Sequence, residues 1–144
     1  ASKVTNAASG SPNKLVFTGN IKPTGTPAGT TVYIINPTVL PIADRATVES
    51  PITVANAAGN GSRTAQVKVS ARHTDRGDLA VFLIAPDGTQ YTLKTATSGD
   101  DVANLNAAYT VDLSGEVRAG TWKLRVQDQF AGDTGTLDTW NLTI

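Results

Sequence analysis

The fold is decided by one stretch, Arg72-His73-Thr74-Asp75-Arg76-Gly77-Asp78-Leu79-Ala80-Val81-Phe82-Leu83-Ile84-Ala85-Pro86-Asp87-Gly88-Thr89. Its charged beginning leads into an apolar run, residues 79–85, which is too short for most helices and is followed by turn residues. We therefore expect a strand that is buried on both faces. The next three residues predict a tight hairpin turn, because proline presets φ, aspartate bonds nearby backbone and Gly88 accepts a positive φ. Residues 90–94 alternate between polar and apolar and should form the returning strand.

Alternating apolar and polar residues extend this pattern in both directions, whereas no stretch has a capped 3.6-residue period. About eight or nine short strands predict an all-β fold, an antiparallel β-sandwich of the jelly-roll type. Pro51 predicts an edge position for its strand, because proline has no N–H to donate to a neighbour. Besides residues 79–85 and 90–94, strands are expected at 31–35, 46–55, 65–72, 109–113, 121–127 and 140–144.

The length of 144 residues predicts one domain. We place it at residues 31–144. Residues 1–30, rich in Ala, Ser, Thr, Gly, Pro and Asn, are interpreted as a linker or loosely attached segment with one short strand at 14–18. The chain begins with Ala rather than Met, so it is interpreted as a processed piece of a larger protein.

The charge composition argues against a nucleic-acid partner. Twelve basic and twelve acidic side chains cancel, and the two halves, residues 1–60 and 61–144, differ little in net charge. The sequence has no cysteine, which excludes disulfides and thiolate metal sites. The longest apolar run is far shorter than the roughly 20 residues that a membrane-spanning helix needs, so no membrane partner is expected.

The residues needed for catalysis are sparse. The sequence has one histidine and no cysteine, and it contains neither His-Glu-x-x-His nor Gly-x-Ser-x-Gly. His73 is interpreted as a structural residue rather than a catalytic base. Asp133-Thr134-Gly135 spells the motif of aspartic proteases, but those enzymes need two such aspartates and the sequence has one copy. We therefore expect the chain not to be an enzyme.

Arg76-Gly77-Asp78 spells an adhesion tripeptide, but it adjoins the most apolar strand. In an extended chain the two charged side chains point to one face, which favours a structural role with each side chain hydrogen-bonded or ion-paired. The same interpretation applies to Arg72 and Asp75.

Calcium is the cofactor that the loop acids favour, because Ca²⁺ takes several carboxylate and carbonyl oxygens together. The expected ligands are Asp100 and Asp101 in one loop and Asp128 and Asp133 in another. The alternative is that these are ordinary solvated acids. The two tryptophans and three tyrosines lie in strand patterns, so most are expected in the core rather than on a platform for sugar or peptide.

Four motifs in order resemble the P domain, or P/Homo B domain, of proprotein convertases and bacterial secreted proteases. They are His73-Thr74-Asp75-Arg76-Gly77-Asp78-Leu79, then Ala85-Pro86-Asp87-Gly88-Thr89, then Gly120-Thr121-Trp122-Lys123-Leu124-Arg125-Val126-Gln127-Asp128, and last Gly132-Asp133-Thr134-Gly135-Thr136-Leu137 with Trp140-Asn141-Leu142. Ile42-Ala43-Asp44 departs from the Ile-Pro-Asp common near the family's start. The residues that the resemblance marks as structural are His73, Arg76, Gly77, Asp78, Gly88, Trp122, Asp128, Asp133, Gly135 and Trp140.

The resemblance implies a β-sandwich jelly roll without a catalytic role. It implies an accessory domain of a secreted, extracellular protease, which packs against, stabilises or targets the catalytic domain of the same precursor, with protein substrate as a further partner. The alternative is an extracellular binding module for carbohydrate or protein, since a jelly roll supports either role. An exposed row of aromatic side chains would favour the binding module, and an apolar patch would favour the accessory role.

Overall fold

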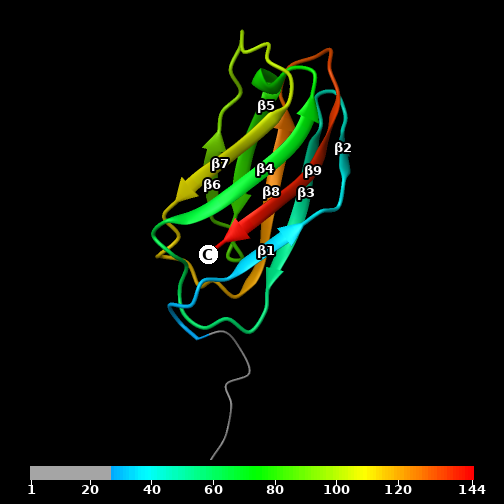
Figure 1. Cartoon of the computed structure of the whole chain (residues 1–144). Coiled ribbons are helices and arrows are strands. Elements are labelled where there is room, and N and C mark those ends of the chain that lie inside the picture. Colours follow the sequence, from blue (N-terminus) through cyan, green and yellow to red (C-terminus); the bar gives the residue numbers. More distant parts are fainter. Residues whose placement is uncertain (1–26) are drawn as a thin grey trace, which may run out of the picture.

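The computed structural model describes residues 27–144 (Figure 1). Most of the segment expected as a linker, including the strand at 14–18, lies outside the described residues. Residues 27–144 form nine strands and one short 3-10 helix, so the all-β prediction is confirmed. The elements are β1 (Tyr33–Asn36), β2 (Leu40–Ile42), β3 (Thr47–Val54), β4 (Ala65–His73), η1 (Arg76–Asp78), β5 (Leu79–Ile84), β6 (Gln90–Lys94), β7 (Leu105–Val111), β8 (Gly120–Asp128) and β9 (Gly135–Thr143).

The strands form two antiparallel sheets, as the predicted β-sandwich requires. One sheet has the order β1-β9-β4-β7, with β2 also paired to β9, and the other has the order β3-β8-β5-β6. The first sheet lies in front of the second in Figure 1. Apolar side chains from both sheets form one core, since alternate residues of a strand point to the same face. The largest fully buried side chains include Trp122, Trp140, Ile42, Leu79, Leu83, Leu113, Leu124, Leu137 and Leu142.

The central stretch forms the predicted strand and hairpin. β5 lies between β8 and β6 in its sheet. The expected burial on both faces holds only in part, because Leu79, Val81 and Leu83 are fully buried in the core whereas Phe82 and Ile84, on the other face, are half-buried. The hairpin turn follows, with the Gly88 N–H donating to the Ala85 carbonyl at 2.9 Å. Gly88 has φ of 94°, where a side chain would be strained. β6 then returns beside β5, and β3, which contains Pro51, lies at the sheet edge as expected.

Three details differ from the sequence prediction. β2 was not predicted, because it has three residues and one of them is Pro41. β7 and β9 begin at Leu105 and Gly135, several residues earlier than expected. Both strands pair with β4. The backbone of β4 hydrogen-bonds the first residues of β7 and β9 into the sheet, although these residues show no alternating apolar pattern. The third difference is η1, where an extended chain was expected.

The two tryptophans confirm the expected aromatic core. Trp122 and Trp140 are buried, and each indole N–H has an acceptor, the Arg118 carbonyl at 2.9 Å and the Ser50 hydroxyl at 2.9 Å respectively. Tyr33, in contrast, is 60% exposed. Among the described residues, no helix has the length and apolar character to cross a membrane.

Candidate functional site

The site is built around η1, the short turn that joins β4 to β5. Three backbone hydrogen bonds fix the turn against the loop after β6: Arg76 N–H to Val102 O at 2.9 Å, Gly77 N–H to Asp100 O at 3.1 Å, and Thr97 N–H to Gly77 O at 2.7 Å. The loop lies so close to the turn that Gly77 has no room for a side chain, because a Cβ atom there would lie 2.5 Å from the Thr97 carbonyl oxygen. The glycine is therefore required by packing.

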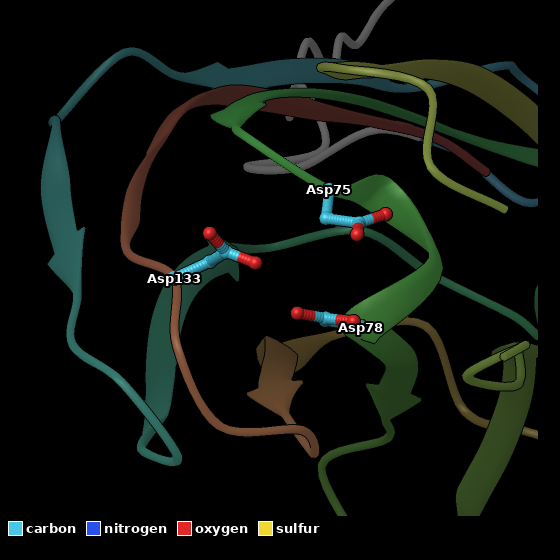
Figure 2. Close-up of side chains that lie close together, drawn as sticks. All are labelled: Asp75, Asp78 and Asp133. Atoms are coloured by element: carbon cyan, nitrogen blue, oxygen red, sulfur yellow. The ribbon is translucent and has the colours of Figure 1, made fainter. Parts of the chain in front are cut away.

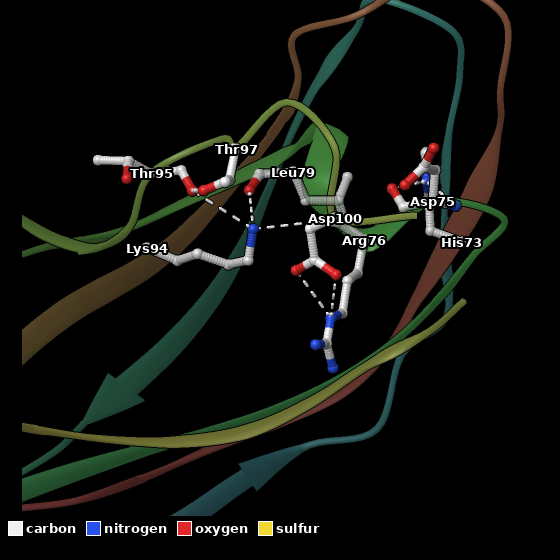
Figure 3. A network of polar contacts seen from close by, with 8 residues as sticks. All are labelled: His73, Asp75, Arg76, Leu79, Lys94, Thr95, Thr97 and Asp100. Atoms are coloured by element: carbon white, nitrogen blue, oxygen red, sulfur yellow. Dashed lines mark hydrogen bonds and ion pairs between the residues drawn. The ribbon is translucent and has the colours of Figure 1, made fainter. Parts of the chain in front are cut away.

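Two cations hold the turn from one side (Figure 3). The Lys94 ammonium donates to the carbonyls of Arg76 at 2.9 Å and Leu79 at 2.8 Å, and burial lowers the pKa of this lysine. The Arg76 guanidinium donates to both carboxylate oxygens of Asp100 at 3.0 and 3.1 Å. This hydrogen bonding keeps the pKa of Asp100 below its usual value. The charge of Arg76 is thus directed at Asp100.

This pairing corrects the sequence-based expectation for the Arg76-Gly77-Asp78 tripeptide. The Asp78 N–H donates to the Asp75 carbonyl at 3.2 Å, which closes a helical turn in place of the expected extended chain. The turn directs the two charged side chains to different places. Arg76 has an ion-pair partner, Asp100, as expected. The Asp78 carboxylate accepts no hydrogen bond from residues 27–144 that meets the usual distance and angle limits.

A buried histidine–carboxylate pair lies behind the turn. His73 Nε2 is 3.2 Å from an Asp128 carboxylate oxygen, and both side chains are fully buried. An ionised carboxylate only accepts hydrogen bonds, so a proton on Nε2 would be donated to Asp128. The other ring nitrogen, Nδ1, lies 2.8 Å from the Asp75 carbonyl oxygen and 3.2 Å from its nitrogen. This pair links the ends of β4 and β8 and positions the backbone of Asp75.

Three aspartates converge beside this pair: Asp75, Asp78 and Asp133 (Figure 2). One carboxylate oxygen from each lies within 4.8 Å of the others. Asp78 is 8% exposed, and the other two are half-buried. Burial, followed by the charges of Asp75, Asp128 and Asp133, raises the pKa of Asp78. We call these three residues the acidic cluster, and its chemistry suits a metal cation.

The predicted calcium ligands do not gather into one group. Asp133 joins the acidic cluster, Asp100 binds Arg76, Asp128 binds His73, and Asp101 is exposed. Two of the four carboxylates, those of Asp100 and Asp128, are thus already paired with basic side chains of the domain. A calcium ion held by the loop of Asp101 stays a prediction.

Two further residues of the motif region have contacts that stabilise the fold. Gly135 begins β9, where a Cβ atom would lie 2.0 Å from the Arg72 carbonyl oxygen. Arg72 itself donates through Nε to Asp138 at 2.8 Å, as the ion-pair interpretation expected.

Sequence reasoning missed Asp75 as a cluster residue and Lys94 as the cation that holds the turn. The spacing of Asp75 and Asp78 carries a signal, because residues three apart share one side of a helical turn. Nothing in the local sequence of Lys94 indicates its carbonyl partners.

The comparisons with known proteins agree with this architecture. The family described as proprotein convertase P-domain matches residues 62–144, more than half of the chain, including all four motifs. The chain belongs to this family. This P domain is 46% identical over 109 residues to the transglutaminase-activating metalloprotease of Streptomyces mobaraensis, covering 75% of the chain and 14% of that protein. It is 37% identical over 102 residues to the extracellular basic protease of Dichelobacter nodosus, covering 71% of the chain and 17% of that protein.

A solved structure supports the fold of the P domain. The serine protease of Aeromonas sobria matches with a TM-score of 0.56 and 19% identity, covering 83% of this chain and 28% of that one. The chain spans only 14% and 17% of the length of these two curated relatives, so their names describe much larger proteins.

Proposed function

We propose that this P domain, at residues 31–144, is the non-catalytic accessory domain of a secreted protease. It packs against, stabilises or targets the catalytic domain of the same precursor. The observation that carries the proposal is membership of the P-domain family, together with the small share of each protease relative that the chain covers. The name of the Dichelobacter nodosus relative supports an extracellular location.

The burial of His73 supports a non-catalytic role. Its side chain is fully buried and its Nε2 is committed to Asp128, so the one histidine of the sequence cannot reach a substrate. A general base must lie within hydrogen-bonding reach of the proton that it removes. Asp133 lies in a cluster of three carboxylates rather than in a dyad with a second Asp-Thr-Gly.

The described surface favours the accessory role over a binding module for carbohydrate. Both tryptophans are in the core, so they cannot form a sugar platform. The exposed large apolar side chains include Tyr33 and Ile35 on β1, 60% and 47% exposed, and Val39 just after it, 54% exposed. Tyr33 and Ile35 share one face of an edge strand, and such an apolar edge suits coverage by another domain.

For the cofactor we propose calcium. The sequence has no cysteine and its histidine is committed, so the available ligands are oxygen atoms, which hard cations prefer.

Two experiments test the accessory role. The coding sequence upstream of Ala1 should encode a protease catalytic domain, and deleting residues 31–144 from that precursor should reduce the yield or heat stability of the secreted protease. A precursor without a catalytic domain would contradict the proposal. The isolated chain should not hydrolyse casein or ester substrates, so turnover that copurifies with it and is lost in His73→Ala would contradict the non-catalytic role.

A further inference from the structure

We propose that Asp75, Asp78 and Asp133 form a binding site for one Ca²⁺ ion. The ion joins η1 to the loop between β8 and β9, residues 129–134. This inference rests on the proposed cofactor for the choice of ion, and it is independent of the accessory role. It places the ion on a different set of residues from the one that the sequence suggested.

The spacing of the three carboxylates suits one calcium ion. Ca²⁺–oxygen distances are about 2.3–2.6 Å, so two ligands on opposite sides of the ion are about 4.6–5.2 Å apart. The three oxygens of the cluster lie within 4.8 Å of one another, which allows all of them to contact one ion without rearrangement. Figure 2 shows the carboxylates facing a common space, with Asp133 approaching from a different segment than the other two.

Asp78 supplies an independent reason to expect a ligand. Its side chain is more than nine-tenths buried, it points into the cluster, and it receives no hydrogen bond from residues 27–144. A buried carboxylate without a partner is costly, so proteins normally pair such a group or give it a metal. A cation between the three carboxylates would supply the missing partner.

The neighbouring basic side chains are directed elsewhere. Arg76 binds Asp100 and Arg72 binds Asp138, so neither neutralises the cluster. His73 turns Nε2 to Asp128, and its Nδ1 faces the backbone of Asp75 rather than a carboxylate of the cluster. Within residues 27–144, no ion pair reaches Asp75, Asp78 or Asp133. Three acids thus face one another, and a divalent cation would remove most of their repulsion.

The arrangement also explains what the ion would do. Asp75 and Asp78 lie at a turn that Lys94 and Gly77 fix rigidly, whereas Asp133 comes from a loop. That loop is tied by the Gly132 N–H, which donates to Asp44 at 2.9 Å. An ion shared by the turn and the loop would hold the ends of β4, β5, β8 and β9 together. Binding should therefore stabilise the folded domain.

Thermal unfolding of the full chain, after removal of metals with EDTA, tests the site. CaCl₂ at about a hundredfold excess over Kd should raise Tm on the order of 5–10 °C, the shift that mass action gives for a domain of this size. Titration calorimetry should find one Ca²⁺ per chain. Asp133→Asn should weaken binding at least about tenfold, which corresponds to 1.4 kcal/mol.

Asp101→Asn is the matched control, because it removes an exposed carboxylate outside the cluster and should leave the calcium response unchanged. If Asp133→Asn does not fold, Asp75→Asn replaces it, with circular dichroism as the check. Equal melting curves in CaCl₂ and EDTA, with no bound calcium, would overturn both the site and the cofactor. Calcium binding that survives Asp133→Asn and Asp75→Asn, or that is lost in Asp101→Asn, would overturn the site alone.

Discussion

Lys94→Met gives a direct test of how η1 is held. The substitution keeps a long, flexible side chain but removes the ammonium that donates to the Arg76 and Leu79 carbonyls at 2.9 and 2.8 Å. A hydrogen bond to a charged group contributes about 1.5–3 kcal/mol. Two such bonds would give about 3–6 kcal/mol if water could not replace them. Because Lys94 is half-buried, water should replace part of this hydrogen bonding. We therefore expect the substitution to lower the free energy of unfolding by about 2 kcal/mol.

For a domain of this size, about 2 kcal/mol corresponds to a fall in Tm of roughly 4–8 °C. The assay is thermal unfolding of the full chain in EDTA, followed by circular dichroism. Lys68→Met is the matched control, because Lys68 is exposed on β4 and none of the described ion pairs includes it. It should melt within about 1 °C of the parent, as surface substitutions usually change stability little.

A second measurement links this lysine to the acidic cluster. If Lys94 holds the turn that carries Asp75 and Asp78, Lys94→Met should also weaken calcium binding, although it contacts none of the three carboxylates. The reasoning is refuted if Lys94→Met and Lys68→Met melt together, since the two carbonyls would then need no ammonium.

Two further predictions concern packing and charge. Gly135→Ala should destabilise the domain by about 3 kcal/mol or more, because its Cβ would lie 2.0 Å from the Arg72 carbonyl oxygen in the paired strand β4. Gly115→Ala, where a Cβ meets nothing within 4 Å, should be nearly neutral in the same melts, and equal effects of the two would refute this. In EDTA, the stability of the parent should fall as the pH rises above the ordinary pKa of an aspartate. The pKa of Asp78 is raised in the folded state, so in this pH range the folded state binds more protons than the unfolded state. Asp78→Asn should lose this pH dependence and be more stable than the parent near neutral pH. If the Tm of the parent and the Tm of Asp78→Asn change in the same way between pH 4.5 and 7.5, the pKa of Asp78 is not raised.

Local patterns determined most of the fold. The apolar run of β5, the hairpin turn at Gly88 and the alternation in β4 and β8 can be predicted because each depends on neighbouring residues. The four motifs likewise indicated the family, since they are ordered in the sequence itself. The edge position of Pro51 followed from its missing N–H.

The tertiary structure alone decided which charges meet. Asp133 reaches Asp75 and Asp78 across more than fifty residues, and neither its loop nor theirs has a sequence pattern that indicates the contact. Arg76 turned away from Asp78 because the chain closed a helical turn instead of staying extended. Side-chain pairing depends on where the ends of β4, β5, β8 and β9 come together, and that depends on the packing of the whole sandwich. The residue types for a hard-cation site were therefore readable from the sequence, but the three aspartates that share one space were not.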